Sequence, residues 1–118
     1  MRSGFKLAPS ILSADFSDLR SALDICNAGG AHWIHVDVMD NQFVPNLTIG
    51  PPVVRSLRPI TKKFLDVHMM VVDPEKLVEP FAKAGADNIT FHILSLIHIS
   101  EPTRLLSIGY AVFCLKKK

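Results

Sequence analysis

Two apolar stretches of this chain carry polar side chains at every second position. The first runs from Ala31 to Asp40 and is rich in β-branched and aromatic residues, which predicts a buried strand. Because side chains alternate along a strand, one face is apolar throughout and the other carries the polar side chains that could bind a ligand or react. The apolar face holds Ile34, Val36 and Val38, and the other face holds Trp33, His35, Asp37 and Met39.

The second stretch, Lys63–Val71, repeats this pattern, with Asp66, His68 and Met70 on one face and Leu65, Val67 and Met69 on the other. On the first stretch alone, His35 and Asp37 fit an ion pair as well as half of a metal site. His68 favours the metal site. The mixed nitrogen and oxygen set of His35, Asp37 and His68 suits one divalent ion of zinc, iron, manganese or cobalt better than calcium.

Strands and helices alternate along residues 6–93. The predicted strands are Lys6–Leu12, Ala31–Asp40, Lys63–Val71 and Ala86–Ile93. The predicted helices follow Asp15, Pro51 and Asp73, and Pro80 is expected to bend the last one. Such alternation indicates parallel strands in an α/β fold, either a doubly wound sheet or a (β/α)8 barrel. Polar residues at strand ends and the lack of a glycine-rich dinucleotide fingerprint favour the barrel.

Composition narrows the class of protein further. The 118 residues are 48% hydrophobic, which suits one domain, and a net charge of +2 implies no nucleic-acid or membrane partner. Two cysteines indicate a reducing compartment. Without an apolar signal core or a membrane-length apolar run, we expect a cytoplasmic protein, although a transit peptide upstream of residue 1 would indicate a plastid form.

Five segments closely resemble the ribulose-phosphate 3-epimerase family. They are Ala8–Phe16, His35–Asp40, Phe43–Asn46, Leu65–Met70 and Phe91–Ile93. The resemblance implies a (β/α)8 TIM barrel that converts D-ribulose 5-phosphate to D-xylulose 5-phosphate with a divalent metal, as in the pentose phosphate pathway. Its partner would be this phosphorylated ketopentose, and the parent protein would be a homo-oligomer.

By position, the resemblance also assigns roles to individual residues. His35, Asp37 and His68 would bind the metal, and Asp37 would also be one of two acid/base carboxylates. Ser10 and His68 would touch the substrate, and Met39 and Met70 would line the reacting centre. Epimerisation fits this set, because it needs two bases flanking the carbon and a cation for the developing enediolate.

The chain departs from the family pattern in two places. Asn41 and Gln42 stand where many members have glycine and histidine, and we interpret them as a permitted variant because Asn tolerates left-handed backbone angles. The fold also typically has about 250 residues. This chain would therefore supply about the first four strands with their helices. The second acid/base aspartate and the phosphate-binding glycine loops would lie in the other half.

Residues 94–118 do not resemble the family. Leu94 stands where the family pattern has glutamate, and Ser95–Arg104 resembles a translated sequencing adapter. Residues 1–93 are thus predicted to be the N-terminal half of the barrel, and residues 94–118 an unrelated, artefactual tail. His98 and Glu101, which lie in this tail, are excluded as ligands.

Three interpretations of function remain open. The parent is a ribulose-phosphate 3-epimerase whose fragment is inactive, the chain is an inert or merely metal-binding half barrel, or the parent is an allulose-6-phosphate 3-epimerase. Two further polar residues receive less specific roles. Asp66 is expected to join an internal polar network, whereas His92 either approaches the substrate or only packs.

Overall fold

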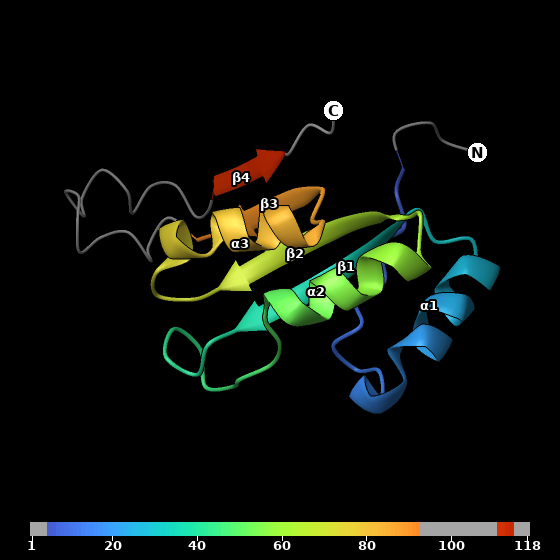
Figure 1. Ribbon diagram of the computed structural model, residues 1–118, viewed down its shortest axis with the longest axis horizontal. Helices are drawn as coiled ribbons and strands as arrows, with labels where there is room; N and C mark the ends of the chain where they lie inside the picture. The colour runs from blue at the N-terminus through green and yellow to red at the C-terminus, as the bar shows by residue number, and fades with distance from the viewer. Residues whose placement is uncertain (1–4, 93–110, 115–118) are drawn as a thin grey trace.

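A computed structural model describes residues 5–92 and 111–114, which form one four-stranded sheet with helices packed on it (Figure 1). The strand order is β1-β2-β3-β4. The strands are β1 (Trp33–Met39), β2 (Phe64–Met70), β3 (Asn88–Phe91) and β4 (Ala111–Cys114). The first three are parallel, whereas β4 pairs with β3 in the antiparallel direction. The parallel strands alternate with helices, which confirms the α/β class.

The helices lie on one face of the sheet, where α2 and α3 run roughly along the direction of the strands (Figure 1). They are α1 (Leu19–Ala28), α2 (Pro51–Leu57) and α3 (Val78–Ala84), with short 3-10 turns at Phe16–Asp18, Arg58–Ile60 and Pro74–Lys76. The Asp18 carboxylate accepts a hydrogen bond from the Ser21 amide at the start of α1, as an N-cap should. Within the described ranges, no helix is long and apolar enough to cross a bilayer.

The core lies between these helices and the apolar face of the parallel strands. Burial alternates strictly along β1, where Ile34, Val36 and Val38 are buried and the residues on either side of each are half-buried. Leu65 and Val67 of β2 join them against Leu23, Val54 and Phe81 from the helices. The predicted division of each strand into an apolar and a polar face is therefore confirmed. The polar residues of β1 lie on the face opposite the helices.

The predicted first strand, Lys6–Leu12, is wrong as a regular strand. Only Ser10 forms a bridge with His35, in the parallel direction, although the segment does run beside β1. The His35 amide donates to the Pro9 carbonyl, and the Ile11 amide donates to the His35 carbonyl. Pro9 has no amide hydrogen, so a regular ladder cannot pass through it.

The predicted bend at Pro80 is also wrong. The segment after Asp73 begins with the 3-10 turn at Pro74–Lys76, and α3 starts only at Val78. Pro80 therefore lies in the first turn of α3, where its missing amide hydrogen removes no hydrogen bond within the helix.

Arg58 ties together the ends of the helices with the starts of β2 and β3. Its Nη1 donates to the Gly85 carbonyl at 2.9 Å and to Asp87 Oδ2 at 2.8 Å. Its Nη2 donates to the Thr61 and Lys63 carbonyls at 3.0 and 2.7 Å. Gly85 ends α3 with φ at +121°, and a Cβ built there would lie 2.5 Å from Arg58 Cδ.

We predict that Gly85→Ala destabilises the fold more than Gly30→Ala. Both glycines have positive φ, but a Cβ at Gly30 (φ +81°) would meet no atom within 4 Å. Backbone strain and displacement of Arg58 should together cost about 2–4 kcal/mol at Gly85, against about 1 kcal/mol at Gly30. Urea unfolding followed by circular dichroism measures both, and equal losses would contradict the role of Arg58.

Candidate metal centre

The register of the parallel strands brings the polar residues into two adjacent rows. His35 of β1 pairs with Asp66 of β2, and two positions further Asp37 pairs with His68. Asp66 in turn pairs with Asn88 of β3. Because residues two apart share a face, both rows project from the side of the sheet opposite the helices.

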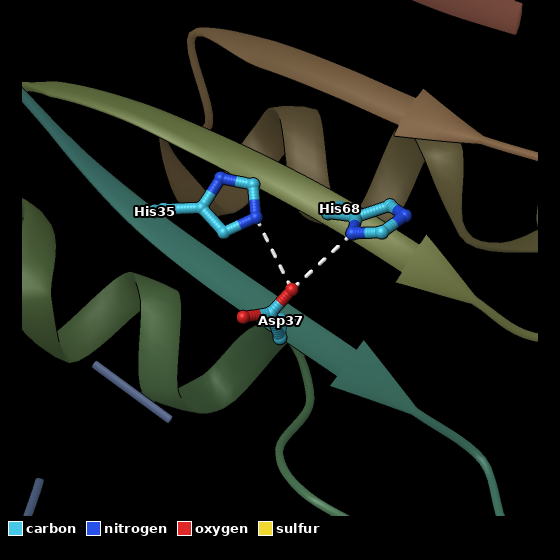
Figure 2. Close-up of side chains that lie close together, drawn as sticks. All are labelled: His35, Asp37 and His68. Atoms are coloured by element: carbon cyan, nitrogen blue, oxygen red, sulfur yellow. Dashed lines mark hydrogen bonds and ion pairs between the residues drawn. The ribbon is translucent and has the colours of Figure 1, made fainter. Parts of the chain in front are cut away.

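His35, Asp37 and His68 converge as the sequence predicts (Figure 2). One carboxylate oxygen, Asp37 Oδ1, lies 3.1 Å from His35 Nε2 and 3.2 Å from His68 Nδ1. One ligand atom from each residue can be chosen so that all three lie within 4.8 Å of one another, and all three residues are half-buried. The two imidazoles thus present different nitrogens to the same oxygen.

This donor set fits a divalent transition metal. Such an ion lies about 2.0–2.2 Å from nitrogen and oxygen ligands, so neighbouring ligand atoms are about 3.0–3.5 Å apart. Both distances from Asp37 Oδ1 to the imidazole nitrogens fall in this range. Two imidazoles and a carboxylate suit zinc, iron, manganese or cobalt, whereas calcium prefers oxygen ligands alone.

Asp66 lies in the internal polar network predicted for it. Its Oδ2 is 2.8 Å from His35 Nδ1, and its Oδ1 accepts a hydrogen bond of 2.8 Å from Asn88 Nδ2. The hydrogen bond with Asp66 raises the pKa of His35 above its ordinary value, more than burial lowers it. Burial acts to raise the pKa of Asp66, but the hydrogen bonds from His35 and Asn88 outweigh it and lower the pKa. Asp66 is therefore ionised at neutral pH.

His92 contacts the outer nitrogen of His68. The two Nε2 atoms are 3.0 Å apart, and the Phe43 ring lies 5.5 Å from the His92 ring. A cavity of about 290 Å³ is lined by His35, His68, Thr90 and His92. His92 thus borders the candidate site, and whether it meets a substrate stays a prediction.

Ser10 lies beside the other oxygen of the Asp37 carboxylate. Its hydroxyl donates to Asp37 Oδ2 at 2.6 Å, and its Oγ accepts from the Leu12 amide. Met39 and Met70 pair with each other one row beyond Asp37 and His68, at the carboxyl ends of β1 and β2. The structure brings Ser10 into contact with Asp37 and places the two methionines next to Asp37 and His68 in the sheet.

Asn88 and Thr90 are the neighbours of the site that the sequence analysis missed. They alternate with Ile89 and Phe91 along β3, just as the polar residues do on β1 and β2. This alternation is the sequence pattern from which Asn88 and Thr90 could have been predicted. His98 and Glu101, excluded as ligands, lie outside the described residues.

The loop after β1 is held by the Asp40 carboxylate. Its Oδ1 accepts from the amides of Gln42 and Phe43, and its Oδ2 accepts from the Val72 amide after β2. Burial acts to raise the pKa of Asp40, but these three hydrogen bonds outweigh it and lower the pKa. Asn41 has φ at +62°, the left-handed conformation that its side chain tolerates.

Comparison with known proteins agrees with these observations. The chain matches the family described as "Ribulose-phosphate 3 epimerase family" over residues 6–111. It is 60% identical over 93 residues to the ribulose-phosphate 3-epimerase of Synechocystis sp., covering 79% of this chain and 40% of the relative. The corresponding enzyme of Treponema pallidum is 56% identical over 98 residues, covering 83% of this chain and 45% of the relative.

A plant relative, the cytoplasmic isoform of ribulose-phosphate 3-epimerase from Oryza sativa, is 57% identical over 88 residues, covering 75% of this chain and 39% of the relative. The chain thus spans about 40 to 45% of the length of these three relatives. An Arabidopsis thaliana relative is named as chloroplastic. The match to the family continues to residue 111, beyond the predicted boundary at residue 93.

The parallel sheet and its His, Asp and His cluster define an α/β protein with a candidate metal centre near the carboxyl ends of its strands. The chain belongs to the ribulose-phosphate 3-epimerase family, a family of isomerases of the pentose phosphate pathway. The family fold is a TIM barrel, and the strand–helix alternation of β1 to β3 is consistent with it.

We predict that Asp40→Asn destabilises the fold at neutral pH but much less in acid. The contribution of the Asp40 carboxylate is present above its unfolded pKa of 3.8 and is lost as pH falls through the lower folded pKa. Because the amide has one acceptor oxygen for three donors, the variant should lose about 1–3 kcal/mol at neutral pH. The deficit should shrink below about pH 4.

Urea unfolding at a series of pH values measures this deficit. Asp24→Asn, at an exposed carboxylate on α1, controls for the loss of one negative charge. A deficit for Asp40→Asn that stays constant from neutral pH to about pH 3 would contradict the assignment.

Proposed function

We propose that this chain supplies the N-terminal half of an enzyme that epimerises D-ribulose 5-phosphate to D-xylulose 5-phosphate. The convergence of His35, Asp37 and His68 in a chain of this family carries the proposal. The phosphorylated ketopentose is the proposed substrate. The relatives named as ribulose-phosphate 3-epimerases support that choice.

Asp37 is the proposed acid/base on one side of the substrate. Epimerisation removes the proton on the carbon beside the ketone and returns a proton to the opposite face, so a base is needed on each side. His35, Asp37 and His68 would hold one divalent ion. When bound, that ion supplies positive charge to stabilise the enediolate. Asp37 Oδ1 faces the imidazoles, which leaves Oδ2 for proton transfer.

Ser10 and His68 are the proposed substrate contacts, and Met39 and Met70 the proposed wall of the reacting centre. The hydrogen bond from Ser10 to Asp37 Oδ2 supports the first assignment, because it places a hydroxyl beside the proposed base. The methionines would offer a polarisable wall without a competing proton. Their position one row beyond Asp37 and His68 supports this role.

Asp66 does not provide the second base. It lies on the same face of the sheet as Asp37, but it is 9% exposed and its two oxygens contact His35 and Asn88. The base on the opposite face of the substrate is proposed to lie in the half of the barrel that this chain does not supply. We therefore propose that the 118-residue chain alone does not turn over the sugar.

Residues 94–118 are proposed not to continue the barrel. The antiparallel direction of β4 supports this, because a (β/α)8 barrel needs a parallel neighbour for β3. We also propose that the parent is a cytoplasmic homo-oligomer without a nucleic-acid or membrane partner. The rice cytoplasmic isoform supports this location, and the chloroplastic Arabidopsis relative supports a plastid form as the alternative.

We predict that the 118-residue chain binds one Zn²⁺ or Mn²⁺ and shows no turnover of D-ribulose 5-phosphate. Competition with a chromophoric chelator measures binding, and a coupled assay of D-xylulose 5-phosphate measures turnover. Asp37→Asn should weaken metal binding at least about tenfold, since it removes the anionic ligand. Turnover by the purified chain would contradict the need for a second base from elsewhere.

We predict that residues 6–93, replacing the aligned segment of the Synechocystis enzyme, give an active chimera. Identity of 60% over the matched region supports compatible packing. Asp37→Asn in the chimera should lower kcat/KM by about 10²-fold or more, whereas Asp24→Asn on α1 should leave it unchanged. Retention of activity by Asp37→Asn would contradict the acid/base role. Turnover of D-allulose 6-phosphate instead of the pentose would favour the alternative epimerase.

A further inference from the structure

The two imidazoles of the candidate metal centre present different nitrogens to Asp37. His35 uses Nε2 and His68 uses Nδ1. A neutral imidazole has one protonated nitrogen and one lone pair, so each ring must hold its proton on the nitrogen that points away from the metal. What contacts that outer nitrogen therefore decides whether the ring is ready to bind.

We infer that Asp66, held by Asn88, is a positioning residue that keeps the proton of neutral His35 on Nδ1 and directs Nε2 to the metal. This inference rests on the proposed metal site. It assigns Asp66 no contact with substrate and no part in proton transfer. Its effect on the centre passes through His35 alone.

The hydrogen-bond chain explains how Asp66 selects this tautomer. An ionised carboxylate only accepts hydrogen bonds, and both nitrogens of His35 face one, Asp66 Oδ2 at 2.8 Å from Nδ1 and Asp37 Oδ1 at 3.1 Å from Nε2. The shorter contact, with Asp66, favours the proton on Nδ1. Asn88 Nδ2 donates to the other oxygen at 2.8 Å and so fixes the orientation of the carboxylate.

The sheet makes this chain of three residues rigid. His35, Asp66 and Asn88 are aligned by register on β1, β2 and β3. Asp66 and Asn88 are 9% and 8% exposed, so packing restricts their rotamers. A site whose outer partners lie on strands is held more precisely than one supported by loops.

The tautomer of His35 in the metal-free wild-type chain tests the inference directly. Long-range ¹H–¹⁵N NMR distinguishes a protonated from an unprotonated ring nitrogen. The spectrum is recorded under alkaline conditions, where the imidazole is neutral. We expect a protonated Nδ1 and an unprotonated Nε2. A proton on Nε2 would overturn the inference without any variant.

A pair of matched variants tests the consequence for metal binding. Asp66→Asn keeps the shape but removes the charge, and the new amide can present either its oxygen or its NH₂ to His35. Its Zn²⁺ dissociation constant, measured by chelator competition, should rise about 10- to 100-fold. NMR of this variant should show both His35 tautomers.

Asp87→Asn is the control, because Asp87 is equally buried at 8% exposure but pairs with Arg58 rather than with the centre. It should lower the free energy of unfolding while leaving Zn²⁺ affinity within about twofold. Equal affinities for wild type and Asp66→Asn would overturn the inference. Failure of the wild type to bind Zn²⁺ would contradict the proposed metal site. It would leave the tautomer result standing, because the tautomer of His35 is measured in the metal-free chain.

Discussion

The parallel register between β1 and β2 is the constraint on which the rest of the structure depends. It runs from Trp33 opposite Phe64 to Met39 opposite Met70 without a bulge. Because a one-residue slip would turn every side chain of a strand to the other face, this register decides core and site together. The candidate metal centre is a direct result, since Asp37 and His68 meet only in this alignment.

The apolar face supplies the free energy that holds this register. Ile34, Val36, Leu65 and Val67 are all fully buried, and each such side chain contributes about 1.5–3 kcal/mol. The opposite face must bury Asp66, which is unfavourable for a lone carboxylate. Two hydrogen bonds to that charged group, each about 1.5–3 kcal/mol, offset the penalty. The site therefore lowers the free energy of unfolding only slightly, as long as its polar network stays complete.

The division into two faces was predictable because alternation is a property of each strand alone. The same reasoning placed His35, Asp37 and His68 on polar faces and Asp66 in an internal network, and the structure confirms both. The particular pairs could not be predicted, since the contact of His35 with Asp66 depends on the register between strands. Two local features near prolines were also predicted incorrectly. Pro9 reduced the predicted first strand to one bridge, and Pro80 fell within the first turn of α3 instead of bending a longer helix.

The two oxygens of Asp37 show how one carboxylate can serve two proposed roles. Oδ1 contacts both imidazoles, whereas Oδ2 accepts the hydrogen bond from Ser10. With a metal held by Oδ1 and the two imidazoles, Oδ2 would remain the oxygen available for proton transfer. The Ser10 hydroxyl would then have to give up this hydrogen bond, or share it, when substrate arrives. In the proposed mechanism the binding of the sugar by Ser10 thus exposes the base that acts on it, and His35 and His68 set which oxygen that is.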